Sequence, residues 1–357
     1  MTTLSLLGVA SALPQKIVEN DSFATGAAER RGMFTAPTRR RNVGRDEMAS
    51  DLIERASHRL IDALHLDPAR DIDLIFTNVT IPDQAFTGCG AEVSHRIGSR
   101  ARWIVDLHNS GCVSFIYMLA LAQRLMETPG IRGALLCNVQ NAAGRVFSHP
   151  DARKKPQAPV PGDGCGVGFV AKSEISPILS VVHRVYGEYA KDMQVATDDG
   201  RYYWEPGKSS FSVAFTEERV ASIISRGNRM VPEVVLEACR EAKRSAREIN
   251  LLITNQPNPI FLRNWREALE LPREKHHDTY DAYGNLFGAA IPINLEDALA
   301  HEKLSPGDLL ALGGFSHAGD YAAAALIRWG HGGHGGHEGH EGHEGHEGHQ
   351  GHEGRRE

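Results

Sequence analysis

The stretch between residues 103 and 126 carries the pattern best suited to covalent chemistry. An apolar run at 103–107 predicts a strand, a short Gly-containing turn follows it, and the apolar, nearly uncharged run at 114–126 predicts a buried helix. Cys112 therefore falls at a helix N-terminus, where the helix dipole and unpaired amides favour the thiolate form. The same amides can stabilise the oxyanion of a thioester, and a thiolate exchanges acyl groups with thioesters at little thermodynamic cost. Cys112 is thus a candidate nucleophile for acyl transfer.

A second interpretation of Cys112 is a small buried cysteine that fills space in the core, a common role for this residue type. Three other cysteines fit that role better: Cys137 within a predicted strand, Cys239 within a predicted helix and Cys165 after a Gly-rich turn. Cys89, at the start of another predicted helix, is the one rival nucleophile. The residues before Cys89 are less typical of a strand-to-helix turn.

The composition is that of a folded protein without a membrane span. Of 357 residues, 41% are apolar and 24% charged, which excludes wholesale disorder and predicts about two domains or one large two-lobed unit. No apolar run approaches the ~18 residues that span a bilayer, and no Lys or Arg precedes the short apolar start, so neither a membrane helix nor a secretory signal is expected. The net charge of −6 gives no electrostatic case for nucleic acid, and five cysteines without a CxxC pair are typical of a cytoplasmic protein.

The C-terminal residues 330–357 differ from the rest of the chain. They hold eight of the 18 histidines, spaced every third residue among Gly and Glu, and no bulky apolar side chain. Such a segment cannot bury a core, so we expect it to be disordered. Its imidazoles could bind nickel, zinc or copper, or the segment could simply be a solvated tail. A tail of this kind forms no preorganised site by itself, so no catalytic metal is expected.

Residues 1–329 alternate predicted strands and helices in two stretches of similar rhythm. Apolar runs predict strands at 4–9, 71–77, 103–107, 133–138, 165–171, 249–254, 308–313 and 322–329. Helical patterns are found at 48–64, 114–126, 231–245 and 291–301. This alternation predicts an α/β fold with parallel sheets, and the repeated rhythm predicts two duplicated halves, 1–172 and 173–329. The polar, aromatic stretch 186–215 is expected to be an inserted lid or pocket wall.

Five segments, in the same order, resemble the β-ketoacyl-acyl-carrier-protein synthase III family of the thiolase-like superfamily. They are Leu-Gly-Val-Ala-Ser-Ala-Leu-Pro at 7–14 with Val-Glu-Asn at 18–20, Cys-Val-Ser-Phe-Ile-Tyr at 112–117, Gly-Asp-Gly-Cys-Gly-Val-Gly at 162–168, Tyr-Gly-Asn-Leu-Phe-Gly-Ala-Ala-Ile-Pro at 283–292, and Gly-Gly-Phe-Ser-His-Ala-Gly at 313–319. The resemblance runs from residue 4 to residue 329. It implies a thiolase-like fold of five layers, αβαβα, built from two duplicated halves and usually found as a homodimer.

The resemblance also implies roles for particular residues. Cys112 would be the nucleophile that carries the acyl group, and Asn285 a catalytic amide. An oxyanion loop is expected at Gly314, Phe315 and Ser316. The implied substrate is a thioester of CoA or of the phosphopantetheine of an acyl carrier protein, with no tightly bound cofactor.

The chain departs from the family at one position of chemical consequence. The family normally has His-Gln-Ala-Asn after the first strand of the second half, and this chain has Asn255-Gln-Pro-Asn258, so Asn255 replaces the histidine. In decarboxylative condensation the family's His and Asn together stabilise the enolate that forms as malonyl loses carbon dioxide. An imidazole also exchanges protons near neutral pH, which an amide cannot do. Asn255 could still donate a hydrogen bond to a thioester oxygen.

Another histidine could replace the missing one. His317 lies in the expected oxyanion loop, where the family prefers Gly, and is a candidate base; otherwise it is a loop residue bonded to backbone. His276 and His277 are interpreted as surface or turn residues, and His108 as support for the turn before Cys112.

Three functions stay open. In the first, Cys112 accepts an acyl group from CoA or a carrier protein and passes it to oxygen, nitrogen or an already activated carbon of a second substrate. In the second, Asn255 and Asn285 suffice as donors for a decarboxylative condensation. In the third, the protein only binds acyl chains or a dimer partner without catalysis. The loss of the histidine favours the first, in specialised, polyketide-type metabolism rather than fatty-acid initiation.

Aromatic and amide side chains are expected to shape the substrate pocket. Phe86 occupies the position where the family lines its acyl pocket near the dimer interface. Tyr202 and Trp204, in the predicted lid, could contact the acyl group or could be plain packing residues. Asn258, which ends the altered motif, is expected to contact substrate.

Two basic runs are candidates for binding the phosphates of CoA or the acidic face of a carrier protein. Arg39 and Arg41 belong to the first run, and Arg153 begins the second. The alternative for both is a solvated charge cluster.

Overall fold

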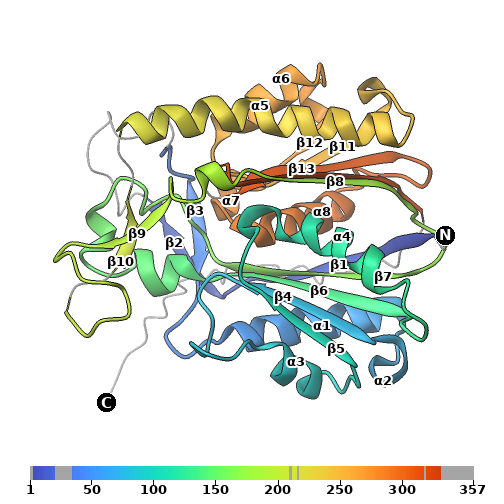
Figure 1. Ribbon diagram of the computed structural model, residues 1–357, viewed down its shortest axis with the longest axis horizontal. Coiled ribbons are helices and arrows are strands. Elements are labelled where there is room, and N and C mark those ends of the chain that lie inside the picture. The colour runs from blue at the N-terminus through green and yellow to red at the C-terminus, as the bar shows by residue number, and fades with distance from the viewer. Residues whose placement is uncertain (1–2, 21–33, 209–210, 215–216, 317–318, 331–357) are drawn as a thin grey trace, which may run out of the picture.

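Five layers alternate helix, sheet, helix, sheet and helix in the computed structural model (Figure 1). The structure describes residues 3–20, 34–208, 211–214, 217–316 and 319–330. This is the αβαβα arrangement that the sequence predicts.

Each central layer is a five-stranded sheet. The first sheet contains β1 (Leu4–Ala12), β4 (Leu74–Val79), β5 (Trp103–Leu107), β6 (Gly133–Gln140) and β7 (Gly164–Lys172), in the order β1-β7-β6-β4-β5. The second contains β8 (Ile178–Val185), β11 (Leu251–Thr254), β12 (His276–His277), β13 (Leu309–Ser316) and β14 (Tyr321–Arg328), in the order β12-β11-β13-β14-β8. Two small hairpins pair β2 (Lys16–Glu19) with β3 (Arg39–Asn42) and β9 (Gln194–Thr197) with β10 (Phe211–Ala214).

Helices cover both faces of both sheets. Figure 1 shows α1 (Ala49–Leu64) and α3 (Gly90–Arg96) outside the first sheet, and α5 (Glu217–Glu241) and α6 (Pro259–Ala268) outside the second. Between the sheets lie α4 (Ser114–Leu125) and α8 (Ala290–Ala300). The shorter helices are α2 (Pro68–Asp71) and α7 (Tyr280–Tyr283).

The strands are buried on both faces, which explains their continuous apolar runs. In β4, Leu74 and Phe76 pack into the core between the sheets, while Ile75 packs into the layer below α1 and α3. In β13, Leu312 faces the central core and Ala311 faces the layer that contains α5 residues. Apolar side chains on both faces are typical of parallel strands covered by helices.

The two sheets repeat one topology. In each, an outer strand pairs antiparallel with its neighbour (β1 with β7, β8 with β14), and that neighbour pairs antiparallel with the next (β6, β13). The remaining two strands follow in parallel (β4 and β5, β11 and β12). The central helices α4 and α8 follow the equivalent strands β5 and β12. We retain 1–172 and 173–329 as the proposed halves, since β7 ends at Lys172 and β8 begins at Ile178.

Several elements, among them α5 and β13, are longer than the sequence predicts. Helix α5 begins at Glu217 rather than at 231 and continues through Pro232, because a proline and Gly227 obscure the helical pattern. Strand β13 extends to Ser316 rather than ending at 313, because its small residues pair with β14 as a strand. No helix in the described ranges has the length and hydropathy to cross a bilayer.

A buried carboxylate joins three segments beside the central layer. Asp163, directly before β7, accepts hydrogen bonds from the backbone N–H groups of Val43, Ala143 and Gly144 at 2.7–2.9 Å. It is fully buried, and this burial raises the pKa of the carboxyl to about 7 although three amides donate to it. Asp163 therefore connects the chain after β3 to the segment after β6.

Candidate active site

A cavity of about 140 Å³ brings together side chains from both halves of the chain. Four of the residues that line it carry thiol or amide groups: Cys112, Gln157, Asn255 and Asn285. The rest are apolar: Phe34, Phe147, Val160, Pro161, Met193, Val213, Ile223, Pro257, Phe261, Phe287 and Phe315. Within the described part of the chain, Cys112 is the one ionisable side chain in this lining. The cavity can thus hold an apolar acyl group against a sulfur atom.

Cys112 lies on the strand-to-helix turn that the sequence predicts. Strand β5 ends at Leu107, a one-turn 3-10 helix spans Gly111–Val113, and α4 starts at Ser114. Ser110 has φ of 60°, a left-handed conformation that is costly for a residue with a side chain, and Gly111 follows with φ of 33°. This sharp turn leaves the Cys112 side chain half-buried at the cavity.

A buried chain of polar side chains holds this turn. Asn78 donates from Nδ2 to the carbonyl oxygens of Leu107 and Asn109, on either side of the end of β5. Its Oδ1 accepts a hydrogen bond from the Ser114 hydroxyl at 3.1 Å, and Asn138 donates to the same hydroxyl oxygen. The first turn of α4 is therefore fixed to β4 and β6 directly beneath Cys112.

The second half of the chain packs closely against the same turn. A side chain at Gly288 would approach the Ser114 hydroxyl oxygen to 2.6 Å and the Gly111 carbonyl oxygen to 2.7 Å. Those distances are shorter than any Cβ contact allows, so only glycine fits at 288. Gly288 thereby lets the segment with Asn285 and Phe287 reach the nucleophile.

The other four cysteines are poor nucleophiles. Burial, together with the nearby carboxylate of Asp106, raises the pKa of Cys89 to about 12. Burial also raises the pKa values of Cys137, Cys165 and Cys239 above the ordinary thiol range. All four side chains are buried, and none lines the cavity. These surroundings remove Cys89 as a rival to Cys112.

Asn255 lines the cavity at the end of β11, but its amide group is already engaged. Its Nδ2 donates to the carbonyl oxygen of Phe315 at 3.0 Å, and its Oδ1 accepts from the Phe315 N–H at 3.3 Å. The Asn255 side chain thus adds two hydrogen bonds to the pairing of β11 with β13, directly after β11 ends. Gly314 makes room for it, since a Cβ there would lie 2.6 Å from Asn255 Oδ1.

Asn285 has a different arrangement. Its Oδ1 accepts from the Phe287 N–H at 3.1 Å, and its backbone pairs with the segment around Pro161. Among the described residues, its Nδ2 has no hydrogen-bond partner, although the residue lines the cavity. Asn285 can therefore donate a hydrogen bond to a carbonyl oxygen of a bound thioester.

Three aromatic residues predicted to line the pocket are absent from the lining of this cavity. Phe86 is fully exposed, and Tyr202 and Trp204 are 64% and 65% exposed at the tip between β9 and β10, stacked on one another. The base of the same segment does reach the cavity, through Met193 and Val213. The segment 186–215 thus forms part of the cavity wall through its base, and contacts of Phe86, Tyr202 and Trp204 with substrate stay predictions.

The remaining predicted contacts also lie apart from the described lining. Asn258 is buried and caps α6, with its Oδ1 accepting from the N–H groups of Ile260 and Phe261. Arg39 and Arg153 are exposed, and Arg41 donates to the carbonyl oxygens of Pro14 and Gln15. A role of Arg39, Arg41 and Arg153 in binding the acyl donor stays a prediction.

The expectation of a loop at 314–316 is wrong. Gly314, Phe315 and Ser316 are buried in β13 and pair with Ala323, Ala322 and Tyr321 of β14. Two consecutive glycines resemble a turn in the sequence, but here they allow close packing within a strand. Of the three residues, Phe315 lines the cavity. His317, the candidate base, lies outside the described residues.

Comparison with known proteins places the chain in a family. A family model described as 3-oxoacyl-[acyl-carrier-protein (ACP)] synthase III C terminal matches residues 239–329. The β-ketoacyl-[acyl-carrier-protein] synthase III 1 of Halalkalibacterium halodurans is 30% identical over 344 residues, which cover 92% of this chain and 100% of that protein. The chain belongs to the β-ketoacyl-acyl-carrier-protein synthase III family.

Solved structures agree with this assignment. The synthase III of Thermus thermophilus matches with a TM-score of 0.78 and 27% identity, covering 91% of this chain and 99% of that one. The priming β-ketosynthase of the R1128 polyketide pathway matches with a TM-score of 0.80 at 21% identity, over 92% and 97% of the two chains, which is a likeness of fold. The fold is therefore thiolase-like, as the sequence predicts.

Membership of the synthase III family makes the protein an enzyme of the acyltransferase class. Enzymes of this family carry out acyl transfer with acyl-CoA or acyl-carrier-protein substrates and need no tightly bound cofactor. The described cavity fits that chemistry, with one thiol and a donor amide in an apolar enclosure.

A second cavity of the synthase III fold carries basic residues that the sequence analysis overlooks. It has a volume of about 360 Å³ and is lined in part by Arg263, Arg266 and Arg273. Helix α6 separates it from the first cavity, since Phe261 lines one and Leu262 the other. The three arginines are spread over 11 positions of sequence and form no run, so only the fold brings them together.

Proposed function

We propose that the protein loads an acyl group from CoA or an acyl carrier protein onto Cys112 and transfers it to an acceptor that needs no strong base. One observation supports this proposal: Cys112 is the one ionisable side chain in the described lining, and the amide of Asn255 is bonded at both ends to Phe315. We place Asn255 at the position of the family's histidine. A cavity of this kind can capture an acyl group but has no described group that takes up a proton.

The loading step follows from the geometry of the turn. The Cys112 thiolate attacks the thioester carbonyl carbon, a new C–S bond forms, and the thiolate of CoA or phosphopantetheine leaves, so charge is conserved. The oxyanion of the tetrahedral intermediate needs hydrogen-bond donors, and Asn285 Nδ2 is one that faces the cavity without another described partner. The apolar lining then encloses the acyl chain.

In the transfer step, the acceptor must lose its proton without help from a base in the described lining. Its oxygen, nitrogen or carbon forms a bond to the acyl carbon while the C–S bond to Cys112 breaks. The acceptor's proton is either lost to solvent before attack or leaves with the sulfur as the Cys112 thiol. Acceptors that are readily deprotonated, or carbon nucleophiles that are already activated, satisfy this condition. Such a role fits specialised, polyketide-type metabolism better than fatty-acid initiation.

A second candidate is the decarboxylative condensation named for the relatives. The relative at 30% identity is a β-ketoacyl-[acyl-carrier-protein] synthase III, and Asn285 is retained. In this case Asn285 would be the main donor to the enolate, with Asn255 supplying its second N–H. The third possibility, a non-catalytic acyl-binding protein, loses support because Cys112 lines an apolar cavity.

Restoring the histidine separates the two reactions. We expect Asn255→His to raise the rate of condensation between an acetyl donor and malonyl-carrier protein by about tenfold or more, because an imidazole supplies the proton exchange that an amide lacks. Acyl loading of Cys112 should stay unchanged. Condensation is measured as carbon dioxide release and β-ketoacyl product.

Asn255→Gln is the matched control, since it keeps an amide, and it should leave condensation at the wild-type level. A wild type that condenses as fast as Asn255→His, or at the rate of a fatty-acid-initiating synthase, would show that the second candidate is correct.

We also propose that the protein is a homodimer formed through β5. Within the described part of the chain, β5 pairs with β4 on one side and with no strand on the other, and its Trp103 is 47% exposed. Phe86, in the connection before α3, is fully exposed. Natural proteins cover an apolar sheet edge of this kind, and a second β5 in antiparallel register would continue the sheet.

Light scattering tests this interface. Wild type should have twice the molar mass of one chain, and Trp103→Lys should shift the population toward single chains, because it places a charge at the start of the edge strand. Tyr202→Lys, at a similarly exposed aromatic position outside β5, should leave the mass unchanged. Single chains in the wild type at micromolar concentration would refute the proposal.

The donor's phosphates are proposed to bind at arginine clusters. Arg39, Arg41 and Arg153 are candidates for this contact. The arginines of the second cavity form another candidate site of the same kind. We further propose a cytoplasmic location, supported by five cysteines that form no disulfide; cell fractionation tests it.

A further inference from the structure

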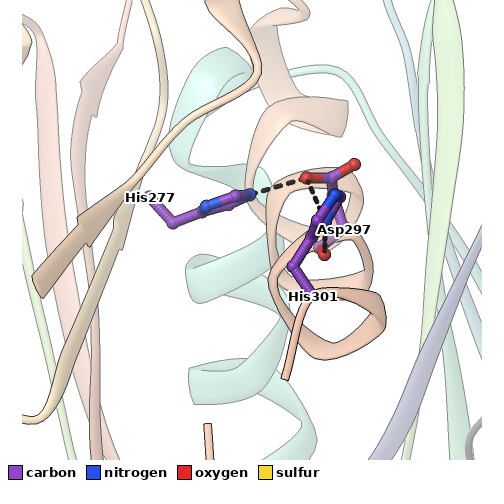
Figure 2. Close-up of side chains that lie close together, drawn as sticks. All are labelled: His277, Asp297 and His301. Carbon is purple, nitrogen blue, oxygen red and sulfur yellow. Dashed lines mark hydrogen bonds and ion pairs between the residues drawn. The ribbon is translucent and has the colours of Figure 1, made fainter. Parts of the chain in front are cut away.

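Three side chains with metal-binding atoms meet at the edge of the second sheet, apart from the residues that line the cavity. Figure 2 shows His277, at the end of β12, pointing toward Asp297 of α8, with His301, directly after that helix, beside the same carboxylate. One ring nitrogen of each histidine and one carboxylate oxygen all lie within 4.8 Å of one another. Asp297 and His301 are four residues apart, so both project from the same helix face.

The distances between the ring nitrogens and the Asp297 carboxylate, and the burial of these side chains, are close to those of a preformed metal site. His277 Nε2 lies 2.7 Å from Asp297 Oδ1, and His301 Nδ1 lies 3.3 Å from the same oxygen. Ligands about 2.0–2.2 Å from a tetrahedral zinc ion are roughly 3.4 Å apart, so a small opening of the His277–Asp297 pair would admit an ion. The side chains of His277 and Asp297 are 17% and 21% exposed, while His301 is 61% exposed and leaves a way in from solvent.

We propose that His277, Asp297 and His301 bind one divalent transition-metal ion, with Zn²⁺ or Ni²⁺ as the fitting class. Two imidazoles and one carboxylate are ligands that these ions prefer, whereas Mg²⁺ and Ca²⁺ prefer oxygen ligands throughout. Water fills the remaining coordination positions. The sequence alone favours a surface or turn role for His277, because Asp297 and His301 are 20 or more positions away and no spacing motif joins the three.

The position of the ion gives it a structural role. Strand β12 is two residues long and pairs with β11 through His276 and His277. The ion would attach this short edge strand to α8 in the central layer. It would also tie together the two ends of the segment 277–297, which carries Asn285 and Phe287 to the cavity. Closing a segment of this length restricts the unfolded chain and so stabilises the folded one.

Thermal unfolding of the full-length protein with and without zinc chloride tests the site. Because an ion that binds only the folded chain stabilises it by mass action, we expect Zn²⁺ at about a hundredfold excess over its dissociation constant to raise the wild-type Tm by roughly 3–4 °C. Mg²⁺ at the same concentration should have no effect. His277→Ala and His301→Ala should each lose the rise.

The histidines of residues 330–357 are candidates to bind the same ions, so total bound metal is not an adequate measure. Every variant keeps those residues, and the comparison between variants removes their contribution. His95→Ala, at an exposed histidine of α3 outside the cluster, is the matched control and should keep the full rise. His277→Gln retains a hydrogen-bond donor toward Asp297 and removes the ring nitrogen, so it serves if His277→Ala does not fold.

Two results would overturn the proposal. One is a wild-type Tm that does not change with saturating Zn²⁺. The other is a Zn²⁺-dependent rise that persists in His277→Gln and His301→Ala, which would place the stabilising ion elsewhere. A rise lost in both variants and kept in His95→Ala supports the site.

Discussion

Cys112→Ala should lower acyl loading by at least about a thousandfold, because it removes the sulfur that forms the thioester and no other cysteine reaches the cavity. Intact-protein mass spectrometry after incubation with a panel of acyl-CoA thioesters measures the loading. A second measurement needs no knowledge of the donor: iodoacetamide should alkylate Cys112 of the wild type faster than the four buried cysteines.

Cys239→Ala is the control for this experiment. It also removes one sulfur, but from α5, where the thiol is buried and its pKa is raised. This variant should load as the wild type does. If Cys112→Ala acquired the same acyl mass as the wild type, the assignment of the nucleophile would be wrong.

Asp163→Ala should have the largest effect on stability. The substitution leaves the N–H groups of Val43, Ala143 and Gly144 buried without an acceptor, at about 1–3 kcal/mol for each unsatisfied group. We expect the free energy of unfolding to fall by about 3–5 kcal/mol, a large part of the stability of a typical folded protein. Urea unfolding at pH 8, above the pKa of this carboxyl, measures the change.

Asp163→Asn is the matched variant for that measurement. Its amide oxygen can still accept from Val43 and Gly144, which share one carboxylate oxygen in the wild type, while the N–H of Ala143 would face an NH₂ group. Asn should therefore cost less than Ala. Equal losses for the two variants, or a loss below about 1 kcal/mol for Ala, would mean that the three hydrogen bonds do not hold these segments together.

The layers and the turn at Cys112 follow from local patterns in the sequence. Strands buried on both faces leave continuous apolar runs, and the predicted strand at 103–107 coincides with β5. The predicted helix at 114–126 differs from α4 by one residue. These elements are short-range features, because each is set by the residues within it.

The positions of individual side chains are harder to predict from the sequence, because they depend on contacts between distant segments. Trp204 is exposed although its residue type suggests a pocket, Phe86 is exposed although the resemblance implies a pocket position, and Asn258 caps α6. Gln157 lines the cavity because its segment packs against that of Val213, 56 positions away. No local pattern marks such a residue, and none marks the three arginines of the second cavity.

The repeated topology has a consequence for how such an enzyme can change. Cys112 comes from the link between β5 and α4, whereas Asn285 comes from the link between β12 and α8, the corresponding position in the other repeat. Under the proposed assignment, the sulfur that carries the acyl group comes from one repeat, and the asparagines that act on the bound group come from the other. Under the same proposal, a replacement at Asn255 would alter the outcome of the reaction while leaving the sulfur and its turn intact, so new products would arise without a new way of holding the starting material.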